Sequence, residues 1–462
     1  MRRDLVVVGA IVSAIFLANL EFTVVVTALP TLAREFPEAT AWLPWITALS
    51  LVAAGATFPI AGKLADSHGP KRLFLAGIGI LTIGSLFSGL VGILLPCRFE
   101  ELIAFRILQG LGGGILAPVG FKIASALYKG KTRTTTLGVA AMVGPLATVL
   151  GPNVGGIMVD NFVWQSIFLL NVPFGLAIGI VAYLVIEEAQ VRKQSSVDMV
   201  GALLLSLILI ILMLSLTTYR ESRSFTLSNV AALTSAIPLV AVLYQIERRS
   251  EAPILDPRLL RDRSLSSIAF LSFLLGVGMY SGLFFLSLYA QNHPAIRASP
   301  TVTGLLLSIG ALGQVVAAPI SGILVQRTGY RIMTMIGLGI TALSFMCLTY
   351  LPTRMEFLAA IFLASRVGGT LAAIPLSAAG LEAFESSAGA ITGIRQMTNV
   401  LGGAFGPVAL GTFLSASDEV PVNEGFAEVF LLLGMLSAAA IFMCKFLPSR
   451  EPEIRKDVRG TT

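Results

Sequence analysis

Long apolar segments alternate with short polar ones along the whole chain. Fourteen of these segments hold about 20 or more mostly apolar residues, the length that a helix needs to cross a bilayer. We place them at residues 5–28, 41–61, 73–96, 99–127, 134–157, 165–186, 199–218, 226–246, 265–290, 302–325, 332–351, 355–380, 389–414 and 426–447. The even number predicts that both termini lie on one side of the membrane. The first segment is too long for the apolar part of a signal peptide, so we interpret it as a span.

The composition supports lipid as the solvent of most of the surface. Hydrophobic residues make up 55% of the 462 residues and charged residues only 13%, whereas soluble domains carry about 25% charged residues. The three cysteines, Cys97, Cys347 and Cys444, are far apart in the sequence. Their spacing predicts neither a disulfide framework nor a metal site. We therefore expect an all-α membrane protein that holds no metal and no cofactor.

Basic residues are distributed unequally between the two sides of the predicted membrane topology. Of the 32 Lys and Arg residues, 23 fall on the side of the termini and 6 on the other side. The remaining three, Arg106, Arg366 and Arg395, lie inside predicted spans. The positive-inside rule then predicts that both termini lie in the cytoplasm. We expect the protein to reside in the plasma membrane. Topology also explains the net charge of +6, so no nucleic-acid partner is needed.

The two ends of the chain resemble each other at an offset of 260 residues. The segment 59–62 (PIAG) matches 319–322 (PISG), Gly69 matches Gly329, and Arg106 matches Arg366. Parallel repeats of this kind are common in secondary transporters. We expect two six-helix bundles, 1–190 and 265–448, separated by two inserted transmembrane helices in 191–250 and a cytoplasmic linker at 251–264, and followed by a cytoplasmic tail at 449–462.

Glu21 is the acidic residue that the pattern places deep inside a predicted span. A charge at mid-bilayer is unfavourable by roughly 2.5–3.5 kcal/mol on insertion scales, so such residues usually serve a function. Arg106 lies at a comparable depth in the fourth segment. We expect the two side chains to pair and Glu21 to load and release a proton. A static ion pair that only holds two helices together is the alternative.

Two glycine-containing segments are candidates for conformational change. The predicted loop between the second and third spans has Gly62, Asp66, Gly69, Lys71 and Arg72, which combine tight turns with paired charges. The fifth span carries six residues that bend a helix or allow close helix packing, namely Gly144, Pro145, Gly151, Pro152, Gly155 and Gly156. A solvated turn and a merely kinked packing helix remain the alternatives for these two segments.

Polar residues inside other spans are candidates for lining a substrate cavity. They are Gln109, Asn153, Arg366 and Arg395. Residues 129–132 (KGKT) resemble the end of a phosphate-binding loop, but Ser125 stands where the leading glycine is required. We therefore expect no coupling to ATP.

These motifs together resemble those of the major facilitator superfamily and, within it, the fourteen-span drug:proton antiporters. The resemblance covers nearly the whole chain and is carried by residues 20–30, 62–72, 106–114, 144–156 and 164–173. It implies two six-helix bundles around a central cavity that works by alternating access. It further implies that Glu21 carries the coupling proton beside Arg106, and that Asp66 belongs to a charge network that steadies the outward-facing state.

The sequence departs from the family pattern at several positions. Glu21 stands where aspartate is usual, and Ser67 and Pro70 stand where basic residues are common. Members of the family that export divalent organic cations often have an acidic residue deep in the second half, and this sequence has none there. The resemblance therefore does not extend to that substrate class. We expect a monomeric, proton-coupled exporter of small amphipathic compounds. A dedicated metabolite or lipid exporter and an uncoupled facilitator are alternatives. An enzyme is not expected, because the chain offers no catalytic cluster.

Overall fold

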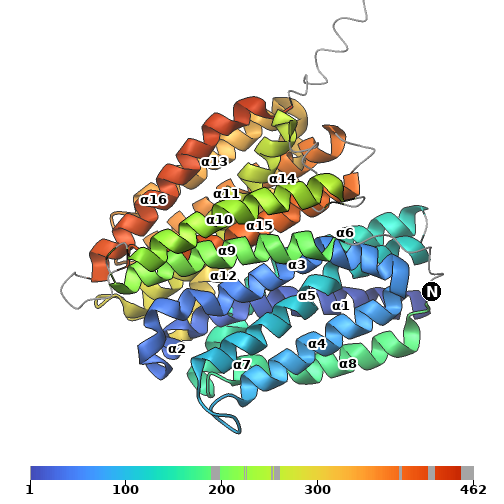
Figure 1. Cartoon of the computed structure of the whole chain (residues 1–462), viewed down its shortest axis with the longest axis horizontal. Helices are drawn as coiled ribbons and strands as arrows, with labels where there is room; N and C mark the ends of the chain where they lie inside the picture. The colour runs from blue at the N-terminus through green and yellow to red at the C-terminus, as the bar shows by residue number, and fades with distance from the viewer. Residues whose placement is uncertain are drawn as a thin grey trace, which may run out of the picture. The chain divides into compact units, whose positions relative to one another are not determined.

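Figure 1 shows the computed structural model of the chain as an assembly of long helices. It describes residues 2–128, 130–188, 198–222, 224, 226–250, 253, 261–383, 388–414 and 422–448. Apart from one isolated bridge between Val91 and Leu95, the regular structure in these ranges is helical, which confirms the predicted all-α class. The predicted tail at 449–462 and most of the predicted linker at 251–264 lie outside the described residues.

Helices follow one another with short connections in both halves of the chain. Up to residue 249 they are α1 (Arg2–Val24), η1 (Val25–Ala28), α2 (Leu29–Glu35), η2 (Pro37–Trp42), α3 (Leu43–His68), α4 (Pro70–Leu90), α5 (Phe99–Leu127), α6 (Gly130–Asn161), α7 (Ser166–Leu169), α8 (Asn171–Val185), α9 (Met199–Ser222) and α10 (Leu227–Arg249). The remainder are α11 (Arg263–Asn292), α12 (Pro300–Thr328), α13 (Tyr330–Leu348), α14 (Met355–Ala383), α15 (Ala388–Gly411), α16 (Val422–Met443) and η5 (Cys444–Phe446).

Thirteen helical stretches in the described ranges are long and apolar enough to cross a membrane. Each corresponds in sequence to one of the fourteen predicted segments. The remaining prediction, 389–414, coincides with the helix α15, which carries Arg395, Gln396 and Asn399 and is not among the thirteen. A count of fourteen therefore stays a prediction.

The segment 62–72 is not a loop, and this part of the sequence-based interpretation is wrong. Gly62 and Asp66 belong to α3, whereas Lys71 and Arg72 belong to the first turn of α4. Gly69 alone joins the two helices, with a φ of +92° that side chains disfavour. Pro70 follows at the first helical position, where its missing N–H group and fixed φ suit a helix start. The motif is thus a single-residue turn between two helices.

The chain forms two compact units. The first comprises residues 1–254 together with 298–305, and the second comprises 255–297 together with 306–462. In the first unit α4 packs against α5 and α8, and α3 packs against α5. In the second unit α11 packs against α15, and α13 packs against α14 and α16. Each unit therefore has its own set of packed helices.

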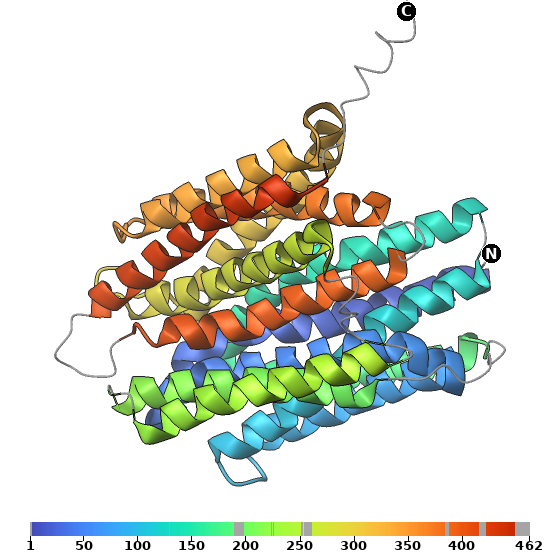
Figure 2. The ribbon, with the colours of Figure 1, turned by 45° about the horizontal axis from the view of Figure 1, so that its top comes forward.

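The two helices predicted as an insertion, α9 and α10, lie side by side in the first unit (Figure 2). Polar contacts attach α9 to the region around the start of α3. The Trp45 indole donates to the Thr217 hydroxyl at 2.9 Å, and Arg220 donates to the Ala41 carbonyl at 3.2 Å. At the start of α10, Thr226 and Asn229 form a reciprocal capping box, which satisfies backbone donors that have no partner within the helix.

Candidate functional site

A fully buried polar cluster joins three helices of the first unit around Glu21. The Glu21 side chain in α1 accepts hydrogen bonds from Arg106 in α5 through one carboxylate oxygen and from Asn171 in α8 through the other. All three residues are inaccessible to solvent in this structure. The expected contact between Glu21 and Arg106 is therefore present. A buried carboxylate is tolerated when its charge is matched and its oxygens have donors, and both conditions hold here.

Arg106 has several partners besides Glu21. Its Nε donates to the Ile46 carbonyl of α3 at 3.0 Å, and its Nη1 also donates to Gln109 Oε1 at 2.9 Å. The guanidinium lies 5.7 Å from the centre of the Phe168 ring in α7, within range of a cation–π contact. Gln109 in turn donates to the Ser85 hydroxyl of α4 at 2.9 Å. The charge of Arg106 is thus held by groups from α1, α3, α5 and α7.

The cluster retains unused hydrogen-bonding capacity. Among the described residues, Arg106 Nη2 and Asn171 Oδ1 are buried with no partner. An unpartnered buried group is unfavourable by about 1–3 kcal/mol. The arrangement is therefore not a saturated structural network. Within the described part of the chain, it leaves one donor on Arg106 and one acceptor on Asn171, the two residues that bond Glu21, without a partner.

A second group of charges lies around the turn at Gly69. Asp66 pairs with Lys122 of α5, and Lys122 also donates to the Gly62 carbonyl at 2.6 Å. This contact joins the end of α3 to α5. Both side chains remain partly exposed, at 36% and 30%, so their interaction is screened and modest in strength.

The start of α4 is capped by Glu188, which lies just after α8. Its carboxylate accepts from the backbone N–H groups of Lys71 at 3.1 Å and Arg72 at 3.3 Å. The Arg72 guanidinium lies 3.8 Å from the same carboxylate. A carboxylate at a helix N-terminus satisfies free N–H groups and opposes the helix dipole. The basic residues of the motif are therefore bound to the connection that follows α8.

The glycine-rich face of α6 packs against α1 and η1. A side-chain carbon added at Gly151 would lie 2.0 Å from the Thr23 hydroxyl, and one at Gly155 would lie 2.3 Å from the Val24 carbonyl. Gly156 is equally close to Pro300, which belongs to the same unit. Gly144 has more room, and Pro145 and Pro152 lie within the helix. The predicted close packing is present in this segment.

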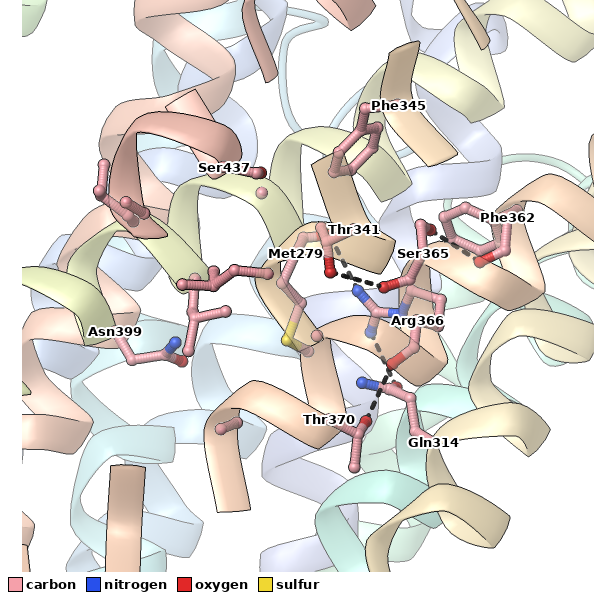
Figure 3. A pocket seen from close by; sticks show the side chains of 17 residues that line it. Met279, Gln314, Thr341, Phe345, Phe362, Ser365, Arg366, Thr370, Asn399 and Ser437 are labelled. Carbon is pink, nitrogen blue, oxygen red and sulfur yellow. Dashed lines mark hydrogen bonds between the residues drawn. The ribbon is translucent and has the colours of Figure 1, made fainter. Parts of the chain in front are cut away.

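The second unit contains a cavity of about 110 Å³ (Figure 3). Arg366 of α14 lines it, together with Gln314 of α12 and Asn399 of α15. Arg395 and Asn153 do not line it. The Asn153 side chain instead donates to Val149 in its own helix. Of the polar residues predicted to line a cavity, Gln109 belongs to the Glu21 cluster and Arg366 to this cavity.

Several residues of the site were missed by sequence reasoning. Asn171, Lys122 and Glu188 have the contacts just described, but a single sequence offers no signal that pairs them with residues about 60 to 150 positions away. Two more buried carboxylates, Asp198 and Glu247, lie at the ends of α9 and α10 near Lys63. The sequence analysis did not single out either residue.

Comparisons with known proteins agree on a family. The family model described as Major Facilitator Superfamily matches residues 11–296 and 266–461. The chain is 28% identical to the multidrug transporter protein MdtP of Bacillus subtilis, over 90% of this chain and 76% of that protein. It is also 28% identical to a tetracenomycin C resistance and export protein of Streptomyces glaucescens, over 94% and 80% of the two chains.

A solved structure supports the same fold. A POT family transporter in complex with 5-aminolevulinic acid superposes with a TM-score of 0.68, covers 94% of both chains and is 16% identical in sequence. At this identity the similarity concerns the fold alone.

Proposed function

The chain belongs to the Major Facilitator Superfamily, and from this premise we propose that it is a proton-coupled antiporter that exports small amphipathic organic compounds. As a member of that family it is a multi-pass membrane transporter of small molecules and not an enzyme. The named relatives are a multidrug transporter protein and a tetracenomycin C resistance and export protein, and they support export of drug-like compounds. Coupling to protons rests on one observation, the buried carboxyl group of Glu21 with its two donors.

The Glu21 cluster has the properties that a coupling site needs. A deprotonated Glu21 neutralises Arg106 and holds α1, α5 and α8 together through Arg106 and Asn171. A protonated Glu21 no longer neutralises Arg106, whose guanidinium then needs another acceptor or water. Proton binding therefore changes which contacts are favourable among three helices of the same unit. A ligand can shift a conformational equilibrium only through such a difference.

The cycle follows from this difference. Glu21 takes a proton from the outer side while substrate leaves, and it releases the proton to the cytoplasm while new substrate binds. Asp66 and Lys122 act as a contact that one state holds and another breaks. The tight packing of α6 on α1 near Gly151 and Gly155 supports a role for α6 in conformational change.

The finer architecture belongs to the same proposal. We infer fourteen membrane spans: the thirteen identified from length and composition, and α15. We also infer two six-helix bundles separated by α9 and α10. Both termini lie in the cytoplasm, the plasma membrane holds the protein, and the monomer transports.

The decisive experiment measures proton movement on substrate addition. Purified protein in lightly buffered detergent solution is titrated with a panel of cationic, neutral and acidic amphipathic compounds, and proton release is recorded with a pH indicator. We expect at least one compound to release protons from the native protein and none to do so from Glu21→Gln. Glu356→Gln, which changes an exposed carboxylate at the start of α14, is the matched control and should behave as the native protein.

Two outcomes would contradict the proposal. Proton release by Glu21→Gln at the native level would remove Glu21 from the coupling step. Export from proteoliposomes that is unaffected by collapse of the pH gradient would instead indicate an uncoupled facilitator. A response confined to one chemical class would favour a dedicated metabolite or lipid exporter.

A further inference from the structure

We propose that the cavity beside Arg366 binds the anionic head group, a carboxylate or a phenolate, of an exported compound. This inference rests on the proposed export function and adds a substrate class to it. Each of the two repeats contains a buried arginine. In the first repeat the arginine pairs with an acidic side chain, and in the second repeat the arginine lies beside a cavity.

Arg366 is buried but only partly satisfied. Its side chain is 5% exposed. Nη1 donates to the Met279 carbonyl at 3.2 Å, and Nη2 donates to Gln314 Oε1 at 2.8 Å. Among the described residues Nε has no partner, and a guanidinium has five N–H groups to satisfy. The two bonds go to neutral oxygens, so they orient the guanidinium without neutralising its charge.

The equivalent arginine of the first repeat is neutralised within the protein. Arg106 corresponds to Arg366 at the offset of 260 residues, and Arg106 pairs with Glu21. At the same offset Glu21 corresponds to Ser281, which carries no charge. None of the 17 described residues that line the cavity is acidic. A buried arginine without a carboxylate is unfavourable unless an anion or water accompanies it.

The rest of the cavity suits the body of an amphipathic acid. Aromatic and aliphatic side chains such as Phe345, Phe362 and Leu338 form much of its wall. The Phe362 ring lies 5.8 Å from the guanidinium of Arg366, which leaves the edge of the guanidinium for an anion. Figure 3 shows Arg366 between Gln314 and Ser365 within this cluster. The volume is smaller than the ~150 Å³ of a cavity that holds benzene in a protein core, so a carboxylate head group fits.

The hydroxyl groups in the cavity favour the same orientation. Thr341 donates to Gly337 at 2.9 Å, and Ser437 donates to Leu433 at 2.8 Å. While these bonds hold, each hydroxyl can only accept from a ligand. Arg366 is the one cationic side chain among the 17 described lining residues, and charge-assisted bonds from a guanidinium to a carboxylate are among the strongest in proteins.

The test compares three probes that share a butylphenyl body and differ in the head group, which is anionic, neutral or cationic: 4-butylbenzoate, 4-butylbenzamide and 4-butylbenzylammonium. Their binding to purified full-length protein is measured by calorimetry in chloride-free buffer. We expect the benzoate to bind most tightly, and Arg366→Gln to weaken its binding at least tenfold, the change that loss of a charge-assisted bond produces. Binding of the benzamide should change by less than twofold.

Two further variants control for misfolding of Arg366→Gln. Arg366→Lys keeps the charge and should retain part of the preference for the benzoate over the benzamide. Arg327→Gln removes an exposed cation from α12, the helix that supplies Gln314, and should leave all three affinities unchanged. Equal weakening of benzoate and benzamide in Arg366→Gln would overturn the inference, as would thermal stabilisation by chloride in place of the benzoate.

The inference can fail separately from the proposed function. Proton-coupled export of cationic or neutral compounds, without benzoate binding that depends on Arg366, would overturn the anion site and leave the exporter intact. Conversely, benzoate binding that Arg366→Gln abolishes supports the site even if Glu21→Gln still couples to protons.

Discussion

At the scale of single residues, the Glu21 cluster shows how a buried charge is made tolerable. Glu21 and Arg106 neutralise each other, and Asn171 supplies the second donor to the carboxylate. Removing one member of a buried pair leaves the other charge uncompensated, which typically destabilises a protein by about 3–5 kcal/mol. Replacing both members with neutral groups removes that penalty.

A double-mutant cycle tests this pairing. We expect Arg106→Gln alone to lower the melting temperature of the purified protein strongly and Glu21→Gln alone to lower it less. The double variant should be more stable than the sum of the single effects predicts, by a coupling of about 0.5–3 kcal/mol. Thermal unfolding of the four proteins in one detergent gives the measurement. Additive effects would show that the two side chains do not interact.

Cys97 offers a second test at this scale. It lies in the exposed connection between α4 and α5, and its thiol donates to Glu35 at 3.5 Å. Desolvation and then the Glu35 carboxylate raise the pKa of the Cys97 thiol. The thiolate is the reactive form, so alkylation needs a higher pH than a free thiol requires. We expect Glu35→Gln to lower that pKa and to speed maleimide labelling at pH 8 a few-fold.

The control for Cys97 changes a carboxylate of the same region that has no bond to the thiol. Glu38→Gln alters an exposed residue of η2 and should leave the labelling rate unchanged. Identical pH profiles for the native protein and Glu35→Gln would contradict the assigned cause.

The sequence predicted the residue types of the site better than their partners. Glu21 and Arg106 could be paired from depth alone, because each lies a similar distance inside its span. Asn171 could not be assigned to Glu21, since an asparagine at a helix start more often caps the helix than reaches a distant carboxylate. Asp198 and Glu247 were missed because a charged flanking sequence normally indicates solvent.

At the scale of elements, the contact between α6 and α1 depends on the absence of side chains. A carbon added at Gly155 would lie 2.3 Å from the Val24 carbonyl and 2.5 Å from the Thr27 hydroxyl. The Val24 carbonyl cannot move without shifting the backbone of α1, whereas the Thr27 hydroxyl is a side-chain group that can rotate. Gly138 lies on the same helix with nothing within 4 Å, so it provides a matched control.

We therefore predict opposite effects from two alanine substitutions in α6. Gly138→Ala should leave thermal stability unchanged or raise it slightly, because alanine is favoured over glycine in helices by about 1 kcal/mol. Gly155→Ala should destabilise the protein by about 1–3 kcal/mol through overpacking and should slow transport. Melting temperatures and export rates measured side by side decide between them. Equal stability of the two variants would contradict the packing argument.

The turn at Gly69 supports a second prediction for elements. Asp66 and Lys122 attach α3 to α5, and their partial exposure limits the pair to about 0–1 kcal/mol. Asp66→Lys should therefore lower the transport rate with little loss of stability. Restoring the pair in reverse with Lys122→Asp should recover part of the rate. Failure of the double variant to exceed Asp66→Lys would show that the pair is not the contact that matters.

Element boundaries were less predictable than element existence. The first predicted span at 5–28 is followed without a break by further helical turns up to Glu35. The predicted span 165–186 is split into α7 and α8. The supposed loop at 62–72 is helical on both sides of Gly69. In the first and third cases the polar residues near a helix end look like a loop in sequence, although they belong to helices.

At the scale of the whole molecule, the number of membrane spans depends on helix α15. Helix α15 is less apolar than its neighbours because it carries Arg395, Gln396 and Asn399. Helix α15 packs closely against another helix, α11. A carbon added at Gly402 would be 2.0 Å from the Phe273 carbonyl of α11, and Asn399 donates to Ser272 of α11 at 3.1 Å. A helix that faces other helices can carry polar residues that lipid would not accept.

This packing argues that α15 is a span, which makes the total fourteen. Thirteen spans would place the termini on opposite sides of the membrane, whereas fourteen place them on the same side. The excess of Lys and Arg on the side of the termini indicates the cytoplasm. We therefore expect green fluorescent protein fused after residue 462 to fluoresce and alkaline phosphatase at the same position to be inactive. The same two reporters placed after Cys97 should give the reverse result, because the proposed topology puts that connection on the outer side. Active phosphatase at the C-terminus would exclude α15 as a span, since only an odd number of crossings could carry the chain there from a cytoplasmic start.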